Sequence, residues 1–390
     1  MSVTAAVALS VVYLPQPMLT ALASSLGVSS AAAGIIATAV TSGYAIGIFF
    51  LVPLTDRFSP RKQISVQLVL LTAALVVTSL LPSVAAVAVG FLAVGLVANI
   101  AQLVIPTAGR LAPADAKGRT TGALVGALLL GIFGGRVVAS VLVSFLDWRV
   151  VVWIFAALVL AVLPLIRLAI GEDAKVGVDK SYGALLLGAL GRIRTSPPLV
   201  QSAIMTFFTF ATFNSLWTTE VLQLTGHTFG WTVLEAGLFG LVGLAAGIVT
   251  PFGGRFIDRF GSIAFNGFFV VLMLVATLAT IVDAGNIWLF GISTFVITWG
   301  SQSIQSSNRS RVLQANPDGP AQANTIFMVA VFAGGSVGAY LGSKAFAIDG
   351  MATVGALGTG LVILAIVAWF VSYGYERRHV RAIPSERVSA

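Results

Sequence analysis

Twelve apolar segments, each long enough to cross a lipid bilayer, take up most of this 390-residue chain. Because a helix rises 1.5 Å per residue, about 20 apolar residues span the hydrocarbon core. Only 9% of the residues are charged, whereas soluble domains carry about 25%. The composition therefore excludes a series of soluble domains and leaves no room for a catalytic domain outside the membrane. The segments are 3–25, 31–54, 63–82, 84–107, 120–145, 150–170, 199–222, 232–254, 262–282, 286–307, 321–343 and 351–373.

The lysines and arginines fall almost entirely on one side of the topology that these segments define. Of 22 such residues, 19 lie in alternate links, in the central polar stretch and in the C-terminal tail. Arg149 and Lys344 lie on the opposite side, and Arg136 lies within a segment. Since basic loops stay in the cytoplasm, both termini are expected to be cytoplasmic, in a bacterial inner membrane. The net charge of +8 then reflects topology and contact with anionic lipid, and not binding to nucleic acid.

The sequence lacks the residues that intramembrane catalysis or metal binding would need. It contains no cysteine and only two histidines, His227 and His379. Disulfides, thiolate catalysis and cysteine-ligated metals are therefore excluded, and neither a His-Glu-x-x-His motif nor a phosphate-binding loop occurs. The chain is predicted not to be an enzyme and to use no cofactor and no metal.

The two halves of the chain repeat one another. The tripeptide DRF at 56–58 returns at 258–260, and the glycine pair at 134–135 returns at 334–335. Such repeats are typical of transporters with a site between the halves. We therefore expect an all-α membrane protein whose twelve transmembrane helices form two pseudo-symmetric six-helix bundles. The expected parts are a bundle at 1–170, a cytoplasmic linker at 171–198 with an amphipathic helix from Ser181 to Arg194, a bundle at 199–373 and a cytoplasmic tail at 374–390.

Several stretches resemble a known family. PLTDRFSPRK at 53–62 and GGRFIDRFG at 253–261 are similar to the signature Gly-x-x-x-Asp-Arg-x-Gly-Arg-Arg/Lys of the major facilitator superfamily. Four others look like its bacterial drug- and sugar-efflux-type branch. They are YLPQP at 13–17, GRVVAS at 135–140, LWTTE at 216–220 and NTIFMVAVFAGGSVGAYLG at 324–342. The resemblance covers nearly the whole chain and implies the major facilitator fold, a small-molecule substrate and a monomeric transporter.

The signature implies a gate between the halves and no contact with cargo. Asp56 lies at a helix end, where a carboxylate can pair with arginine and with a facing helix N-terminus. Breaking such pairs would release one access state for the other. The alternative is a solvated loop that only fixes the topology. Val52 and Ser59 replace the two glycines of the signature, so looser helix packing is expected there. The implied gating residues are Asp56, Arg57, Arg61, Lys62, Asp258 and Arg259.

Arg136 lies past the middle of the fifth segment, where its side chain is too far from either end to reach the interface. An arginine at that depth costs at least about 2.5 kcal/mol on insertion scales, so it is expected to face a cavity or a polar partner. Its fork of donors suits a carboxylate, a phosphate or sugar hydroxyls. We predict that Arg136 binds substrate, and the alternative is a structural arginine bonded to backbone carbonyls of a neighbouring helix.

Of the acidic residues, only Glu220 and Glu235 lie near membrane depth. Glu220 lies in the outer part of the seventh segment beside Trp217, where loss of hydration would let its carboxyl carry a proton. The alternative is a glutamate in contact with water at the interface. Glu235 opens the eighth segment and is expected only to favour the dipole of that helix.

Polar uncharged residues gather on the first, fourth, seventh and tenth segments, where the resemblance places the cavity. Along each helix they are spaced by three, four or seven residues, which makes one polar stripe on an otherwise apolar surface. We predict contacts with substrate, and the alternative for each residue is hydrogen bonding between helices. They are Tyr13, Gln16, Asn99, Gln102, Asn214, Trp217, Thr218, Thr298, Gln302, Gln305 and Asn308.

These features predict a secondary active transporter that moves a small molecule across the bacterial inner membrane by alternating access. Efflux of a drug-like compound or metabolite in exchange for protons is favoured by the efflux-like stretches. A proton-coupled importer or a facilitator of a small organic anion or sugar is the alternative, because Arg136 suits an anion and no acidic residue lies at mid-membrane. A channel or a receptor stays open, since a fold does not dictate function.

Overall fold

The computed structural model describes residues 1–112, 117–171, 181–250, 254–282 and 285–380, and every regular element within these ranges is a helix. The elements before the central linker are α1 (Ser2–Tyr13), η1 (Gln16–Met18), α2 (Leu19–Leu26), α3 (Ser30–Leu51), η2 (Val52–Asp56), α4 (Pro60–Ser79), α5 (Val84–Val97), α6 (Ile100–Leu111), α7 (Lys117–Leu129), η3 (Leu130–Gly134), α8 (Gly135–Val143), α9 (Trp148–Ala161) and α10 (Leu163–Ala169). They are followed by α11 (Tyr182–Thr195), α12 (Pro197–Thr225), α13 (Val233–Leu238), α14 (Gly240–Val249), α15 (Gly254–Val282), α16 (Ile287–Gln314) and α17 (Pro320–Val380). The predicted all-α class is confirmed.

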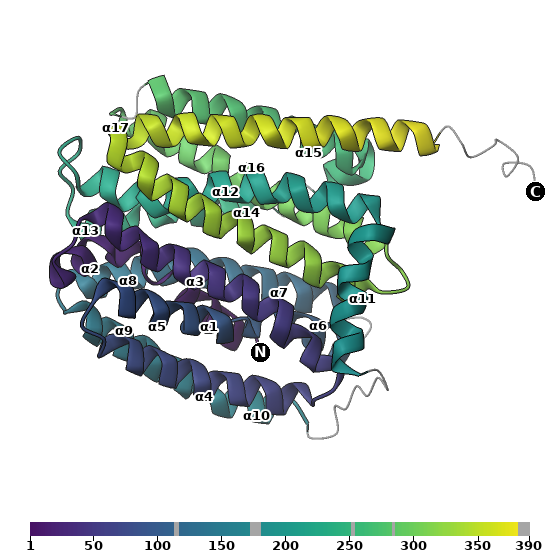
Figure 1. Cartoon of the computed structure of the whole chain (residues 1–390), viewed down its shortest axis with the longest axis horizontal. Coiled ribbons are helices and arrows are strands. Elements are labelled where there is room, and N and C mark those ends of the chain that lie inside the picture. Colours follow the sequence, from purple (N-terminus) through teal and green to yellow (C-terminus); the bar gives the residue numbers. More distant parts are fainter. Residues whose placement is uncertain (113–116, 172–180, 251–253, 283–284, 381–390) are drawn as a thin grey trace, which may run out of the picture.

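The apolar segments of the sequence coincide with these helices, although they divide differently. Within the described ranges, nine helices are long and apolar enough to cross a membrane, or ten if the bent pair of α1 and η1–α2 is one span. The span at 320–378 holds two predicted segments, since Asp349 and Gly350 leave helical geometry and α17 reverses its direction there (Figure 1). The helix at 233–249 is apolar but shorter. Each of the twelve predicted segments therefore corresponds to a helical stretch.

Side-chain caps start several helices just after the short links between the apolar segments. Ser29, Ser59 and Ser83 each accept a hydrogen bond from the backbone N–H three residues later, at the starts of α3, α4 and α5. Thr232 and Glu235 form a reciprocal capping box at the start of α13. Such caps typically stabilise a helix by about 1 kcal/mol each, so the short polar links also fix where each helix begins.

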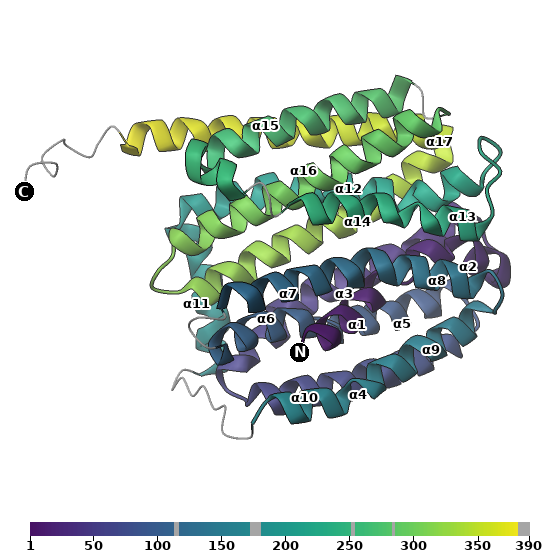
Figure 2. The ribbon, with the colours of Figure 1, turned by 180° about the vertical axis from the view of Figure 1, so that it is seen from behind.

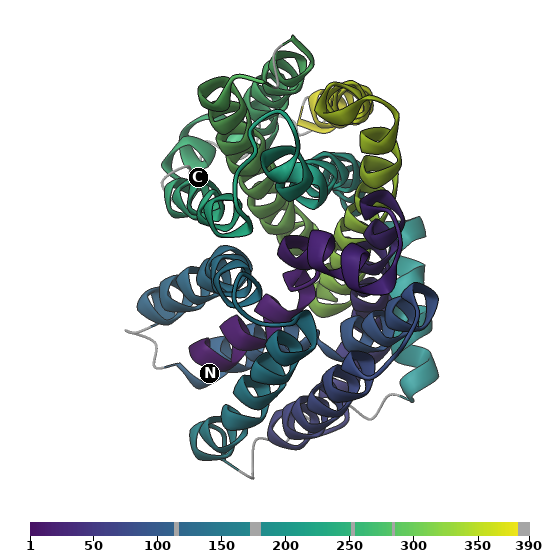
Figure 3. The ribbon, with the colours of Figure 1, turned by 90° about the vertical axis from the view of Figure 1, so that its left-hand side faces the viewer.

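Two groups of helices lie side by side. Helices α1–α10, purple to blue, form one group, and α12–α17, teal to yellow, form the other (Figures 1 and 3). Helix α11 runs across one end of the molecule, where Tyr182 Oη donates to Phe50 O at 2.6 Å (Figures 1 and 2). We call this end the linker side and the opposite end the far side. The bundles at 1–170 and 199–373 stay a prediction about which parts move together.

Helices within each group pack closely where glycine allows it. A Cβ atom on Gly338 in α17 would lie 2.1 Å from Ala211 O in α12, and one on Gly43 in α3 would lie 2.0 Å from Leu92 O in α5. No side chain fits at such distances, so glycine lets the two backbones approach, as in other membrane helix pairs. Both contacts lie within a group of helices, and the cavity described below lies between the groups.

Candidate substrate cavity and far-side seal

A cavity of about 590 Å³ lies between the two helix groups, within the range of about 300–1,000 Å³ that small-molecule sites occupy. Its walls come from α1, α6, α7 and η3 of one group and from α12, α14, α16 and α17 of the other. Most of the lining is apolar. Because Gly122, Thr250 and Arg309 lie near the linker-side ends of their helices, the cavity extends toward the linker side. The lining residues with polar side chains are Tyr13, Gln102, Thr250, Gln302, Gln305, Ser306 and Arg309.

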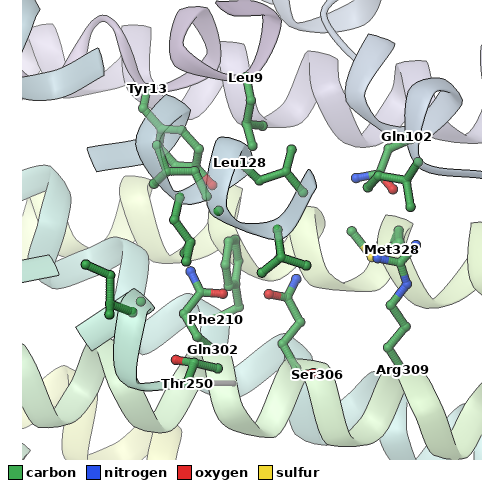
Figure 4. Close-up of a pocket in the computed structure, with 18 of the residues that line it drawn as sticks. Leu9, Tyr13, Gln102, Leu128, Phe210, Thr250, Gln302, Ser306, Arg309 and Met328 are labelled. Carbon is green, nitrogen blue, oxygen red and sulfur yellow. The ribbon is translucent and has the colours of Figure 1, made fainter. Parts of the chain in front are cut away.

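Four of the residues predicted to contact substrate line this cavity. Tyr13 and Gln102 reach it from one helix group, and Gln302 and Gln305 reach it from α16 of the other. In Figure 4, Gln302 extends from α16 toward the side where Tyr13 lies. The polar stripe of α16 therefore faces the opposite group of helices across the cavity.

Asn99 and Asn308 belong to the same predicted stripes but do not line the cavity. Asn99 accepts a hydrogen bond from Gln67 Nε2 at 3.4 Å and donates to Leu96 O at 2.7 Å. Asn308 donates to Thr206 Oγ1 at 2.9 Å and accepts from Asn266 Nδ2 at 2.8 Å. Both amides join helices within their own group, which is the alternative that the sequence left open for them.

Arg136 lies beyond the far-side end of the cavity, at the start of α8. Its Nε and Nη2 atoms both donate to Gln16 Oε1, at 3.0 and 2.5 Å. The guanidinium carbon lies 4.6 Å from the ring centres of both Tyr13 and Trp217. The π-helical turn η3 directly precedes α8, and such turns are frequent at functional sites. With only 4% of its surface exposed, Arg136 is held by an amide and aromatic rings and does not reach the large cavity.

Gln16 connects this arginine to the other helix group. While its oxygen accepts from Arg136, its Nε2 donates to Asn214 Oδ1 at 3.0 Å and to Thr218 Oγ1 at 3.3 Å. Trp217, from the same turn of α12, donates to Thr298 Oγ1 at 2.9 Å. We call Gln16, Arg136, Asn214, Trp217 and Thr218 the far-side seal, because their contacts join the two groups of helices above the cavity.

Glu220 lies on α12 next to the far-side seal and is buried, with 6% of its surface exposed. It shares with Arg136, Trp217 and Ser140 a cavity of about 10 Å³, which is about the space that one water molecule needs. Its Oε1 has no hydrogen-bond partner within the described part of the chain. The carboxyl of Glu220 and the guanidinium of Arg136 both line this small cavity. The structure thus places Glu220, the predicted proton carrier, beside Arg136, the predicted substrate-binding arginine. The two residues belong to opposite helix groups.

Two further contacts join the groups. Ser42 in α3 and Ser336 in α17 share a short hydrogen bond between their hydroxyls. The rings of Tyr44 and Phe332 lie 4.3 Å apart between their centres, on the same two helices. The α3–α17 contact therefore flanks the cavity on one side, while the far-side seal closes its end.

The implied gating residues lie on the linker side. Arg57 and Lys62 are exposed, and Arg61 is half-buried, around the short link from η2 to α4. Asp56 ends η2, and Asp258 and Arg259 lie in the first turns of α15, but the side chains of these three residues lie outside what the structure describes. In the described ranges, no group of three or more His, Asp or Glu side chains could hold a metal ion.

Arg309 is one of the 19 basic residues that the sequence pattern assigns to topology alone. Its side chain lines the large cavity, and its Nε donates to Asn324 Oδ1 at 2.9 Å. The sequence spacing nevertheless indicates a place in the cavity. Arg309 follows Gln302 and Gln305 at spacings of seven and four residues, so the three side chains share one helix face.

Comparisons with known proteins agree with this architecture. A sequence model of the Major Facilitator Superfamily matches residues 1–339. The uncharacterized transporter YgaY of Escherichia coli is 29% identical over 97% of this chain and 95% of its own length. The chloramphenicol efflux pump Rv0191 of Mycobacterium tuberculosis is 25% identical over 89% of this chain and 86% of its own. The solved structure of the nucleoside transporter NupG superposes with a TM-score of 0.73 at 15% identity, over 96% of each chain. The chain therefore belongs to the Major Facilitator Superfamily and is a membrane transporter, not an enzyme.

Proposed function

We propose that this transporter exports a small amphipathic molecule across the bacterial inner membrane in exchange for protons, as a monomer, by alternating access. The observation that carries the proposal is the cavity of about 590 Å³ between the helix groups, with the far-side seal at one end. A cavity closed at one end and extending toward the other is what one half of an alternating-access cycle requires. In this cycle the bundles at 1–170 and 199–373 rock against each other.

The linker side is taken to face the cytoplasm. Arg110, Arg167 and Arg311 lie in the last turns of α6, α10 and α16, which end at that side. Basic residues favour the cytoplasmic side of a membrane, so both termini are placed in the cytoplasm. The structure then corresponds to a state in which substrate enters from the cytoplasm and the far-side seal blocks its exit.

Glu220 is proposed to carry the exchanged proton. A buried carboxyl is less costly to the protein when it is neutral, so the far side closes most readily after Glu220 has taken up a proton from outside. Entry of substrate on the linker side then accompanies release of that proton, and charged Glu220 favours hydration and opening of the seal. Arg136 is the positioning residue in this step, because it holds Gln16 against Asn214 and Thr218 while it acts on Glu220 through its charge.

The signature residues are proposed to act as a gate on the linker side. Arg57, Arg61 and Lys62, with Asp56, Asp258 and Arg259, are proposed to form the pairs that close this side when the far side opens. Tyr13, Gln102, Gln302 and Gln305 are proposed to contact substrate. Export is favoured over import by similarity to a relative that is named as a chloramphenicol efflux pump.

Flux in everted membrane vesicles tests this function. A proton gradient with an acidic interior is expected to drive saturable uptake of amphipathic compounds, with chloramphenicol and naphthylacetate as the first probes, and a protonophore should abolish it. The gradient acts because one pH unit supplies about 1.4 kcal/mol, which corresponds to a tenfold accumulation. Uptake that is unaffected by the gradient in either direction would rule out proton exchange, and unsaturable flux would indicate a channel.

A further inference from the structure

We propose that Arg309 forms an anion-binding subsite at the linker-side end of the cavity, and that the substrate carries one carboxylate-class anionic group on an apolar body. The inference rests on the proposed function and names the chemical class of its substrate. It moves the anion contact from Arg136, where the sequence placed it, to a cation that lines the cavity itself.

Arg309 has no acidic partner among the residues that the structure describes. Its Nε donates to Asn324 Oδ1 in α17, which orients the guanidinium plane. The rest of the guanidinium extends past Met328 toward Gln102 of the other helix group (Figure 4). A cation in a mainly apolar cavity is costly unless an anion joins it. The missing counter-ion is therefore expected to come from the ligand.

Arg311, two residues further along α16, shows how this fold neutralises an arginine when its role is structural. Its Nε contacts Glu376 Oε1 at 3.1 Å, its Nη1 donates to Ser202 Oγ at 3.2 Å and its Nη2 donates to Gln201 Oε1 at 2.9 Å. Every nitrogen of Arg311 is used within one group of helices. Among the described residues, Arg309 uses only its Nε in this way, so its terminal nitrogens are available as a fork for a carboxylate.

The neighbours of Arg309 complete a binding site for an anion. Gln305 and Ser306 line the cavity from the preceding turn of α16, and Gln102 lines it from α6. Gln102 Nε2 contacts Tyr44 Oη only weakly, at 3.5 Å, so this amide can turn toward a ligand. These side chains offer hydrogen-bond donors to the same cavity, from both groups of helices.

The apolar part of the ligand has a matching surface. Leu9, Val125, Leu128, Ile132 and Phe210 line the same cavity as Arg309 and Tyr13. A substrate that spans this cavity would place its anion at Arg309 and its apolar body toward the far-side seal. Binding would then draw the two helix groups together at the linker side, which is the direction that export requires.

The subsite is tested with ligands that share one apolar body and differ in the charge of their polar group. Binding is measured by isothermal titration calorimetry, with the protein in phosphatidylcholine nanodiscs. The probes are naphthylacetate, naphthylacetamide and naphthylethylamine. Wild type should bind the carboxylate at least about tenfold more tightly than the amide, since hydrogen bonds to charged groups are about twice as strong as neutral ones. Arg309→Gln should remove this preference, and Arg309→Lys should keep part of it. Arg311→Gln, the matched control, should keep all of it despite a lower melting temperature.

Equal affinity of wild type for the carboxylate and the amide would overturn the proposal without reference to any variant. Loss of carboxylate binding when phosphatidylglycerol is added to the nanodiscs would assign the site to a lipid headgroup and overturn a soluble substrate. The subsite and the proposed function fail separately. A carboxylate preference that depends on Arg309, without flux of naphthylacetate in vesicles, would contradict export alone. Flux without that preference would contradict the subsite alone.

Discussion

Replacing Arg136 with glutamine is expected to reduce transport at least about 100-fold, because a seal weakened by about 3 kcal/mol or more shifts its equilibrium by that factor. The substitution removes two hydrogen bonds to Gln16 Oε1 and the cation between the rings of Tyr13 and Trp217. Hydrogen bonds to a charged group contribute about 1.5–3 kcal/mol each, and a desolvated cation–π contact contributes up to about 2 kcal/mol. The far side of the carrier should then fail to close, while the cavity is unchanged. Saturable flux in vesicles and ligand binding by calorimetry would separate the two effects.

Arg149 provides the matched control for this prediction. It also lies on the far side, 4.4 Å from the ring centre of Trp148 and 2.9 Å from Ser25 Oγ, and these partners among the described residues belong to its own helix group. It is partly exposed, with a distant partner in Asp147 at 3.8 Å, and such pairs contribute about 0–1 kcal/mol. Arg149→Gln should therefore transport normally. If Arg136→Gln transports as well as Arg149→Gln does, the far-side seal is not part of the cycle.

Replacing Glu220 with glutamine is expected to abolish concentrative transport and leave substrate binding intact. Glutamine imitates the protonated carboxyl and cannot release a proton, so a gradient of one pH unit can no longer contribute its about 1.4 kcal/mol. Accumulation should fall about tenfold, to the level of equilibrium, and its dependence on pH should disappear. Substrate binding should persist, because Glu220 does not line the large cavity. Uptake measured at several pH values on each side of the vesicle membrane checks this result.

Glu235→Gln is the control for the coupling assignment. Glu235 lies on the same side of the molecule but is used in the capping box with Thr232, where it accepts from the backbone N–H at 2.8 Å. The substitution should leave the response to the proton gradient unchanged. A Glu220→Gln variant that still accumulates substrate in proportion to the gradient would exclude Glu220 as the proton carrier.

The fold could be predicted from the sequence because each span is a local property. A run of apolar residues bounded by a capping serine forms a helix whatever its neighbours are, as at Ser29 and Ser83. Other local features left no such signal. Two examples are the bend between α1 and α2 and the π turn before Arg136. Both depend on packing between helices, which the hydrophobic pattern of one segment does not contain.

The sequence predicts a site residue only where the chemistry of that residue does not depend on its neighbours. Arg136 is costly in a membrane wherever it faces, so its importance was evident. Its partner Gln16 is 120 residues away and became visible only when η1 and α8 were brought together. Asn99 and Asn308 lie on polar stripes that indicate a cavity, but their amides form hydrogen bonds between helices instead. A polar stripe alone does not distinguish these two roles. Arg309 was missed since its place near a helix end suggested a role in topology.

The two sides of the transporter are proposed to open in opposite senses, and distances between spin labels test this most directly. The chain contains no cysteine, so paired cysteines can be introduced without further changes. Phe145→Cys with Ile348→Cys reports on the far side, and Leu111→Cys with Leu313→Cys reports on the linker side, all at exposed positions. On addition of a transported ligand at high pH, the far-side distance should increase while the linker-side distance decreases. Distances that stay fixed, or that change in the same sense, would contradict an alternating-access carrier.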